Sequence, residues 1–224
     1  TVDALRAAGA ADRLDVEGLV HHGIELRFDG ERHRLDFPAL TGGRTVTIYA
    51  QTEIVKDLIA LQLADGPPLL FEAEALAVEH PQSGAPVVRF RHEGLERTLH
   101  CAWVAGCDGS HGVARNAFPA AAGRAYAHDY PYSWLGVTAE VPPSCHELIY
   151  ARHARGFALH SMRSPRVSRL YLQVPRGTSG RDWPDERIWA DLAARFAVAA
   201  DWTLCPGPIT ARSVTDMRSL VREP

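Results

Sequence analysis

The sequence predicts a mixed fold of the α+β or α/β class whose largest element is a mostly antiparallel β-sheet. Three observations predict it. Several short segments alternate apolar and polar residues with period two, as half-buried strands do, and other segments carry apolar residues at helical spacing. Long strand-like segments also follow one another directly between residues 134 and 174. Consecutive strands joined by short turns pair antiparallel, so this last region is expected to form the sheet.

The first part of the chain contains both kinds of segment. Asp29-Gly30 separates two alternating runs and is typical of a hairpin turn, and Gln51 begins a run with helical spacing. The expected elements are a helix over residues 1–8, a loop over 12–18, a hairpin of strands 22–28 and 32–37, a strand over 45–49 and a helix over 51–64.

The middle and last parts are dominated by strands. The expected strands are 69–78, 87–92, 96–99, 101–105, 134–141, 147–151, 156–162, 167–174 and 209–216. A helix is expected over residues 182–197, with Ile188, Leu192 and Phe196 on one side. Strand 101–105 leads into a glycine-rich elbow at residues 106–112, after which a short helix is expected near Val113.

Composition excludes several classes of function. The 224 residues are 46% hydrophobic and 23% charged with a net charge of −3, values typical of a globular protein without a basic surface for nucleic acid. No apolar run approaches the roughly 20 residues of a membrane span, so we expect a cytoplasmic protein. Four scattered cysteines without a C-x-x-C pair predict neither a disulfide framework nor a metal site.

The elbow Asp108-Gly109-Ser110-His111-Gly112 is the most specific local motif. A glycine-rich turn after an apolar strand presents backbone N–H groups and a carboxylate to a polar ligand. Arg115 follows seven residues after Asp108, where an ion pair could hold the turn in shape. Taken alone, the same dipeptide is also a common turn without a ligand.

A second set of polar residues lies on the predicted sheet. Alternate side chains of a strand share a face, so Ser161 and Arg163 project together, and Tyr171 on the next strand could reach the same place. A guanidinium with two hydroxyl groups forms a good receptor for a carboxylate. Read alone, Arg163 is also consistent with a surface charge on a half-exposed strand, and the spacing does not decide between the two.

This segment resembles the substrate strands of the flavoprotein aromatic hydroxylases, in particular the 4-hydroxybenzoate 3-monooxygenase family. The similarity includes Glu147-Leu-Ile-Tyr150, Arg155-Gly-Phe-Ala-Leu159 and Gln173-Val-Pro175, and it extends over essentially the whole chain. The elbow resembles the D-G motif of that family, although Gly112 stands where the family often has serine.

The resemblance implies roles for individual residues. Tyr150 would hydrogen-bond the substrate phenol and help to remove its proton, and His21 would lie at the outer end of the proton relay. Gln51 and Asp108 would contact FAD, His111 and Arg218 would lie near the nicotinamide nucleotide, and Gly109 and Arg115 would shape the D-G turn. The implied substrate-binding residues are Tyr150, Ser161, Met162, Arg163 and Tyr171.

The resemblance also implies cofactors and organisation. The expected cofactors are FAD, NADPH or NADH as co-substrate, and O2. The partners would be a small aromatic acid and a second copy of the parent enzyme, with no nucleic acid or membrane. Residues 1–125 would form part of a glutathione-reductase-like FAD-binding domain, residues 126–216 a substrate domain whose sheet is covered by helices, and residues 217–224 a return toward the first domain.

We expect the chain to be a central fragment of such an enzyme. The two main flavin-binding motifs of the family, G-x-G-x-x-G and G-D, would precede Thr1 and follow Pro224. The isolated chain would then bind flavin weakly or not at all and be inactive.

Four functions are compatible with these patterns. The first is hydroxylation of 4-hydroxybenzoate to 3,4-dihydroxybenzoate, and the second is hydroxylation of another small aromatic acid. The third is a non-catalytic module that binds aromatic carboxylates, or an inert fragment. A Ser-His-Asp hydrolase ranks last, because no G-x-S-x-G elbow is present.

Overall fold

The computed structural model describes residues 1–109, 111–117, 124–198 and 202–222. By their contacts the residues form two compact units, one of residues 1–64 with 128–219 and one of residues 65–127 with 220–224. The domain boundaries predicted near residues 125 and 216 stay a prediction. In the described ranges, no helix is long and apolar enough to span a bilayer.

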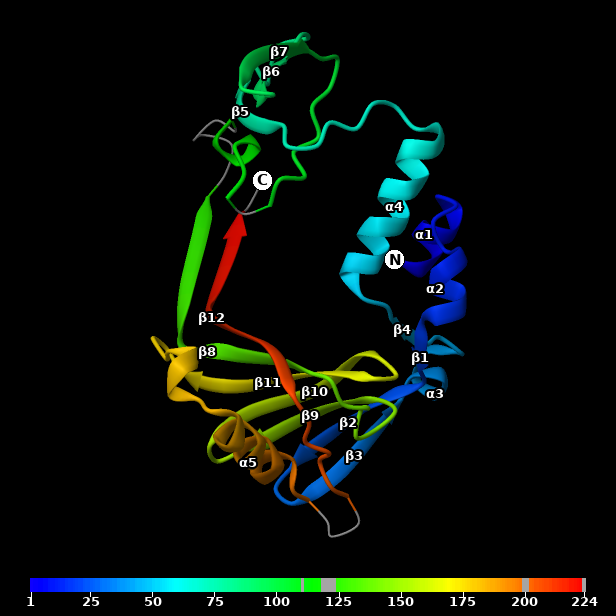
Figure 1. Ribbon diagram of the computed structural model, residues 1–224, viewed down its shortest axis with the longest axis vertical. Helices are drawn as coiled ribbons and strands as arrows, with labels where there is room; N and C mark the ends of the chain where they lie inside the picture. Colours follow the sequence, from blue (N-terminus) through cyan, green and yellow to red (C-terminus); the bar gives the residue numbers. More distant parts are fainter. Residues whose placement is uncertain (110, 118–123, 199–201, 223–224) are drawn as a thin grey trace. The chain divides into compact units, whose positions relative to one another are not determined.

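The first unit is built on a seven-stranded sheet with the order β12-β8-β11-β10-β9-β2-β3 (Figure 1). The neighbours β8, β11, β10 and β9 pair antiparallel, as predicted, whereas β2 pairs with β9 in parallel. The hairpin formed early in the chain therefore extends a sheet formed mostly by residues more than a hundred positions later. The strands are β2 (Gly23–Phe28), β3 (Glu31–Asp36), β8 (Ala125–Ala139), β9 (Leu148–His153), β10 (Gly156–Ser164), β11 (Val167–Pro175) and β12 (Ile209–Arg222).

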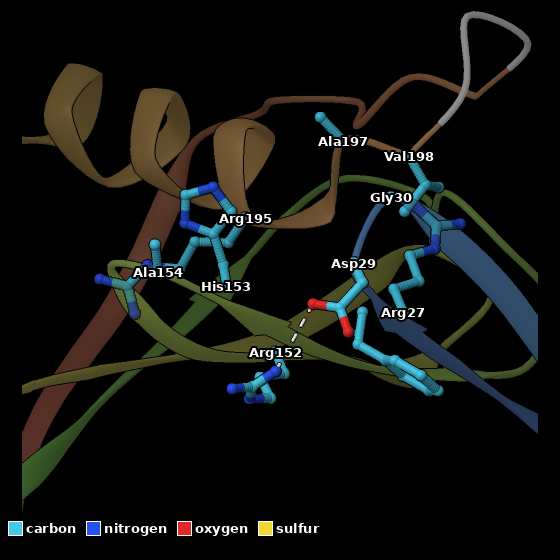
Figure 2. Close-up of a pocket in the computed structure, with 10 residues that line it drawn as sticks. Arg27, Asp29, Gly30, Arg152, His153, Ala154, Arg195, Ala197 and Val198 are labelled. Carbon is cyan, nitrogen blue, oxygen red and sulfur yellow. Dashed lines mark ion pairs between the residues drawn. The ribbon is translucent and has the colours of Figure 1, made fainter.

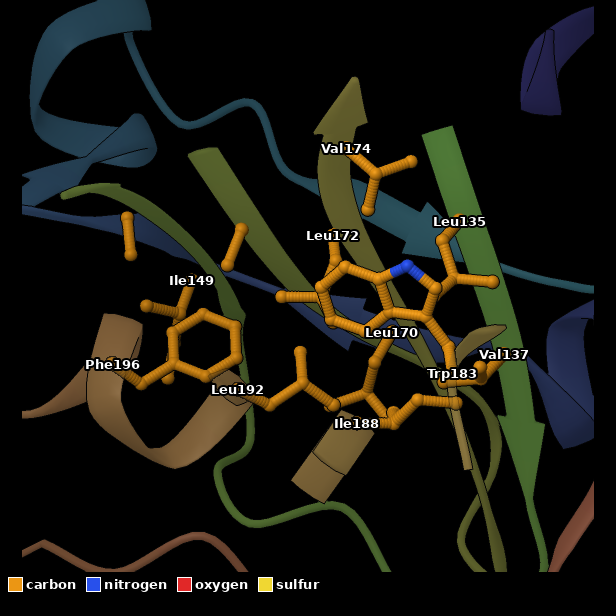
Figure 3. Packing of buried hydrophobic residues seen from close by; sticks show 12 residues of the cluster. Leu135, Val137, Ile149, Leu170, Leu172, Val174, Trp183, Ile188, Leu192 and Phe196 are labelled. Carbon is orange, nitrogen blue, oxygen red and sulfur yellow. The ribbon is translucent and has the colours of Figure 1, made fainter. Parts of the chain in front are cut away.

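One face of this sheet is covered by helix α5 (Asp185–Phe196), close to the predicted range (Figures 1 and 3). Ile188, Leu192 and Phe196 of α5 are each 0% exposed, because their spacing puts all three on the helix side that meets the sheet. The sheet residues packed against this helix face include Leu135, Val137, Ile149, Leu170, Leu172 and Val174.

The helices of the N-terminal part form a second, smaller core. Helices α1 (Val2–Ala7) and α2 (Asp12–Glu17) bury Leu5 and Leu14. The predicted loop over residues 12–18 is wrong: Leu14 packs inward, and Arg13 forms an ion pair with Glu17 one turn later. Helix α4 (Gln51–Asp65) forms as predicted, but no residue in it is buried.

Short elements connect these parts of the first unit. Strands β1 and β4 form a two-stranded antiparallel sheet in which His21 pairs with Val46. The connecting elements are β1 (Leu19–His21), α3 (Phe37–Thr41), β4 (Val46–Ile48) and the 3-10 turn η3 (Gly180–Asp182).

The second unit contains the three-stranded antiparallel sheet β5-β6-β7. Its strands are β5 (Glu74–Glu79), β6 (Val87–His92) and β7 (Leu95–His100), and the 3-10 turn η1 (Ala114–Ala117) follows the elbow. The strand predicted over residues 101–105 is wrong, and the strand predicted over residues 69–78 forms only from Glu74 onward, as β5. An apolar run becomes a strand only where another strand pairs with it, and none in the described residues does so here; Trp103 is 91% exposed.

The packing of α5 predicts a large effect of truncation. Leu192→Ala should lower the free energy of unfolding by about 2–5 kcal/mol, because the side chain is fully buried and its removal leaves a cavity. Urea unfolding measures this effect. Leu63→Ala is the matched control, since Leu63 of α4 is 62% exposed and its truncation should cost little. Equal losses in the two variants would contradict this account of the core.

Candidate functional site

The sheet face opposite α5 carries the polar residues predicted for substrate binding. Leu159 of β10 pairs with Tyr150 of β9 on one side and with Tyr171 of β11 on the other. Neighbouring strands lie about 4.8 Å apart, so the backbones of the two tyrosines are separated by about 10 Å. Leu159 lies between them on the same face.

Ser161 and Arg163 lie farther along β10, on the same face. Ser161 is directly opposite Arg169 of β11, and a bulge between Met162 and Ser164 leaves Arg163 without a pairing partner on β11. A bulge redirects the side chain of the extra residue. Ser161 is half-buried and Arg163 is exposed.

Met162 does not join this face with its side chain. It lies between Ser161 and Arg163 in the sequence, so the alternation of the strand turns it toward the α5 side, where it is 2% exposed. Its predicted role in substrate binding is therefore corrected: only the main chain of Met162 lies beside Ser161 and Arg163.

A cavity of about 810 Å³ brings two of the predicted residues together. Arg163 lines it from the end of β10, and Gln51 lines it as the first residue of α4. Thr138 of β8 lies on the same wall. The cavity therefore joins the residue predicted to bind a carboxylate with the residue predicted to contact FAD.

His21, the predicted outer end of a proton relay, is only 1% exposed. Neither ring nitrogen has a hydrogen-bond partner among the described residues. Burial lowers the pKa of His21, and the nearby Glu147 carboxylate raises it by a smaller amount. The neutral ring is therefore favoured, and its position gives no direct contact with bulk water.

His160 is a buried histidine that the sequence pattern does not single out. It lies on the α5 side of β10, is 0% exposed, and its Nε2 accepts a hydrogen bond from the Ser144 N–H at 3.1 Å. Burial, together with the Arg27 charge, lowers the pKa of His160 to about 4. Alternation along the strand predicts a buried position but gives no sign of this pKa.

Arg169 is a second residue that the sequence-based prediction missed. Its Nη1 donates to Thr138 Oγ1 at 2.8 Å, and its guanidinium carbon lies 4.8 Å from the centre of the Tyr171 ring. A signal for it exists in the sequence, because Arg169 and Tyr171 are two residues apart on one strand and so share a face.

In the second unit, the elbow folds tightly around Asp108. Asp108 Oδ2 accepts a hydrogen bond from the Ala114 N–H at 2.9 Å, and a Cβ at Gly112 would lie 2.0 Å from the Asp108 carboxyl carbon. Gly109 has a φ of +75°, which glycine adopts without strain. The glycine at position 112, a departure from the family pattern, therefore suits this carboxylate position.

The other residues predicted for the nucleotide sites lie in two distant parts of the sequence, His111 and Arg115 in one and Arg218 in the other. His111 is exposed at the elbow of the second unit, and Arg115 lies in η1. Ser110 is outside the described residues. Arg218, in β12 of the first unit, lies 3.5 Å from the Asp129 carboxylate.

A smaller cavity of about 280 Å³ contains none of the predicted residues (Figure 2). It lies where the turns after β2 and β9 meet the end of α5. Its buried arginines, Arg27 and Arg195, are bound to Glu25 and Asp191, and Arg152 lies 3.6 Å from Asp29 at its rim. The arginines that line this cavity are therefore all paired with carboxylates.

Comparison with known proteins adds an independent line of argument. The model of the FAD binding domain family matches residues 1–224, the full length of the chain. The chain belongs to this family. The predicted resemblance to flavoprotein aromatic hydroxylases is thereby supported at the level of the whole chain.

A curated relative and two solved structures are similar to the chain. The chain is 40% identical over 224 residues to p-hydroxybenzoate hydroxylase of Acinetobacter baylyi, covering the whole chain but 55% of that protein, so it spans about half the relative's length. It matches p-nitrophenol 4-monooxygenase from Pseudomonas putida DLL-E4 with a TM-score of 0.72 at 12% identity, over 99% of the chain and 57% of that structure. It also matches aklavinone-11 hydroxylase in complex with FAD and aklavinone with a TM-score of 0.70 at 16% identity, over 100% of the chain and 46% of that structure. These two likenesses confirm the predicted mixed fold.

The buried His160 predicts an acid-sensitive stability. Its folded pKa of about 4 lies below the ordinary value of 6.5, so the unfolded chain takes up the proton first as the pH falls. The contribution of neutral His160 is complete above pH 6.5 and is lost as the pH falls toward 4, by up to roughly 3 kcal/mol.

Urea unfolding between pH 4 and 8 measures this loss. His160→Gln retains an acceptor for the Ser144 N–H but does not titrate, so its unfolding free energy should fall less over this pH range. Parallel curves for the two proteins would remove His160 as the source.

Proposed function

We propose that this chain is part of a flavin-dependent hydroxylase that converts 4-hydroxybenzoate to 3,4-dihydroxybenzoate with NADPH or NADH and O2. The observation that carries the proposal is the sheet face opposite α5, to which the strand register assigns Tyr150, Ser161, Arg163 and Tyr171. The 40% identity to a protein named p-hydroxybenzoate hydroxylase supports the same substrate.

The two ends of the proposed substrate call for different groups. The carboxylate is matched by the Arg163 guanidinium, which can bind both oxygens through its planar fork, and by the hydroxyl groups of Ser161 and Tyr171. The phenol is matched by Tyr150, whose hydroxyl can donate a hydrogen bond to the phenolate oxygen. Binding at both ends orients the ring carbon next to the phenol for reaction.

The larger cavity suits a flavin in two respects. It includes the first residue of α4, where the helix dipole favours negative charge, and Gln51 supplies an amide there. A bound flavin supplies the activation of O2 and the transfer of one oxygen atom to the ring. Asp108, with Gly109 and Arg115 shaping its turn, remains a proposed contributor to flavin binding, and His111 and Arg218 remain proposed contributors to nicotinamide binding.

The chain's own residues would prepare the ring by removing the phenol proton. An electron-rich phenolate ring reacts more readily with an electrophilic oxygen donor than the neutral phenol does. Tyr150 would stabilise the phenolate, and His21 would accept the released proton, although burial lowers its pKa and makes it a weaker base. The cytoplasmic location and dimeric state of the parent enzyme are part of the same proposal.

Activity of the full-length protein tests this proposal. Addition of 4-hydroxybenzoate should stimulate NADPH or NADH oxidation and yield 3,4-dihydroxybenzoate. Stimulation by a different aromatic acid alone would favour the second candidate substrate class. Binding of aromatic acids without any oxidation would favour a non-catalytic module.

The carboxylate site can be tested separately with Arg163→Ala. This variant should weaken 4-hydroxybenzoate binding by about 2–5 kcal/mol, since it removes a charged partner of a desolvated carboxylate. Equilibrium titration monitored by flavin absorbance provides the dissociation constant. Arg166→Ala is the matched control, because Arg166 is an exposed arginine in the adjacent turn and does not line the cavity. An unchanged dissociation constant for Arg163→Ala would remove this residue from the pocket.

A further inference from the structure

Arg169 is held in the sheet without a carboxylate partner. Among the described residues, no Asp or Glu oxygen lies within ion-pair distance of it, and its buried Nε has no hydrogen-bond acceptor. Its bonded contact is the Thr138 hydroxyl, at 2.8 Å from Nη1. The positive charge is therefore left uncompensated on the face that carries Ser161 and Arg163.

The neighbouring strand β8 has a glycine where the Arg169 guanidinium lies. Gly136 of β8 is directly opposite Tyr171. A Cβ at Gly136 would lie 2.7 Å from Arg169 Nη2 and 3.0 Å from Tyr171 Cε1, so a larger residue there would displace the guanidinium from this position. Thr138 follows two residues later on the same face and fixes the end of the stacked group.

Thr138 also connects this stack with the larger cavity. Thr138 pairs with Arg169 of β11, and it lines the larger cavity together with Arg163. Trp134, on the same face of β8, packs edge-on against the Tyr171 ring at 6.2 Å between centroids. Tyr171 is thus held between a tryptophan edge and a guanidinium whose own position depends on one hydroxyl group.

We propose that Thr138 is a positioning residue for aromatic-carboxylate binding, which acts by holding Arg169 against the ring of Tyr171. The fixed Arg169 keeps the Tyr171 hydroxyl directed at the carboxylate and adds a second positive charge near it. Without the Thr138 hydroxyl, the long arginine side chain regains its rotamers and both contributions weaken. This inference rests on the proposed function, because Tyr171 is placed at the carboxylate by that proposal.

Two substitutions at position 138 separate the hydroxyl from the shape of the side chain. Thr138→Val retains the branched shape and loses the acceptor, whereas Thr138→Ser retains the acceptor. The matched control is Thr210→Val on β12, whose hydroxyl donates to the Thr138 carbonyl at 3.3 Å and not to Arg169.

The readout is the dissociation constant of the flavin-loaded full-length protein for 4-hydroxybenzoate and for its neutral amide, 4-hydroxybenzamide. Thr138→Val should weaken 4-hydroxybenzoate binding roughly tenfold, in keeping with the loss of a hydrogen bond to a charged group, and leave amide binding within about twofold. Thr138→Ser and Thr210→Val should leave both constants within about twofold.

A double-mutant cycle tests whether the effect passes through Arg169. In an Arg169→Met background, Thr138→Val should have no further effect on 4-hydroxybenzoate binding. A tenfold loss that persists in this background overturns the inference. Equal weakening of the acid and the amide by Thr138→Val also overturns it, because that result indicates a general packing role.

Failure of the proposed function has a different signature. If the unsubstituted protein does not bind 4-hydroxybenzoate, the proposed function and this inference both fall. If the unsubstituted protein binds it and Thr138→Val binds it equally well, the inference alone is overturned.

Discussion

The packing of α5 on one face of the seven-stranded sheet is the constraint on which the rest of the first unit depends. It buries Ile188, Leu192 and Phe196 against the sheet and thereby assigns every second residue of β8 to β11 to a dry interior. The residues between them must point to the other side. The polar face is therefore a consequence of where the apolar residues are buried, and a shift of one residue in any strand would exchange the two sets.

This constraint explains why much of the sheet could be predicted from the sequence. The period-two patterns of β9, β10 and β11 are local, and they are sufficient to place Ser161, Arg163 and Tyr171 on a common face. The parallel pairing of β2 with β9 could not be predicted in this way, because it joins residues 24–27 to residues 148–151 and depends on contacts between distant segments. Nor could the bulge at Arg163, since a single extra residue leaves no mark in the alternation.

The wrong predictions have the same physical origin. Residues 12–18 look like a loop by composition, but burial of Leu14 and the Arg13 to Glu17 ion pair make a helix there. Residues 101–105 are apolar enough for a strand, yet backbone pairing requires a neighbouring strand, which the described residues do not provide. In the first case a tertiary contact overrode the local pattern, and in the second the contact that a strand needs is missing among the described residues. The site residues taken from the family resemblance stay predictions, apart from the Met162 side chain, which points to the α5 side of the sheet.

The alternation of side chains along each strand also explains why His160 of β10 and Arg169 of β11 lie in different surroundings. His160 points to the α5 side, where burial favours the neutral ring and its Nε2 needs only the Ser144 N–H. Arg169 points to the other side, where its guanidinium lies over the Tyr171 ring and donates to the Thr138 hydroxyl. A cation kept without a carboxylate partner attracts an anion from outside the chain more strongly than a paired one would. The same sheet therefore holds a neutral histidine on its α5 side and presents positive charge on the opposite face.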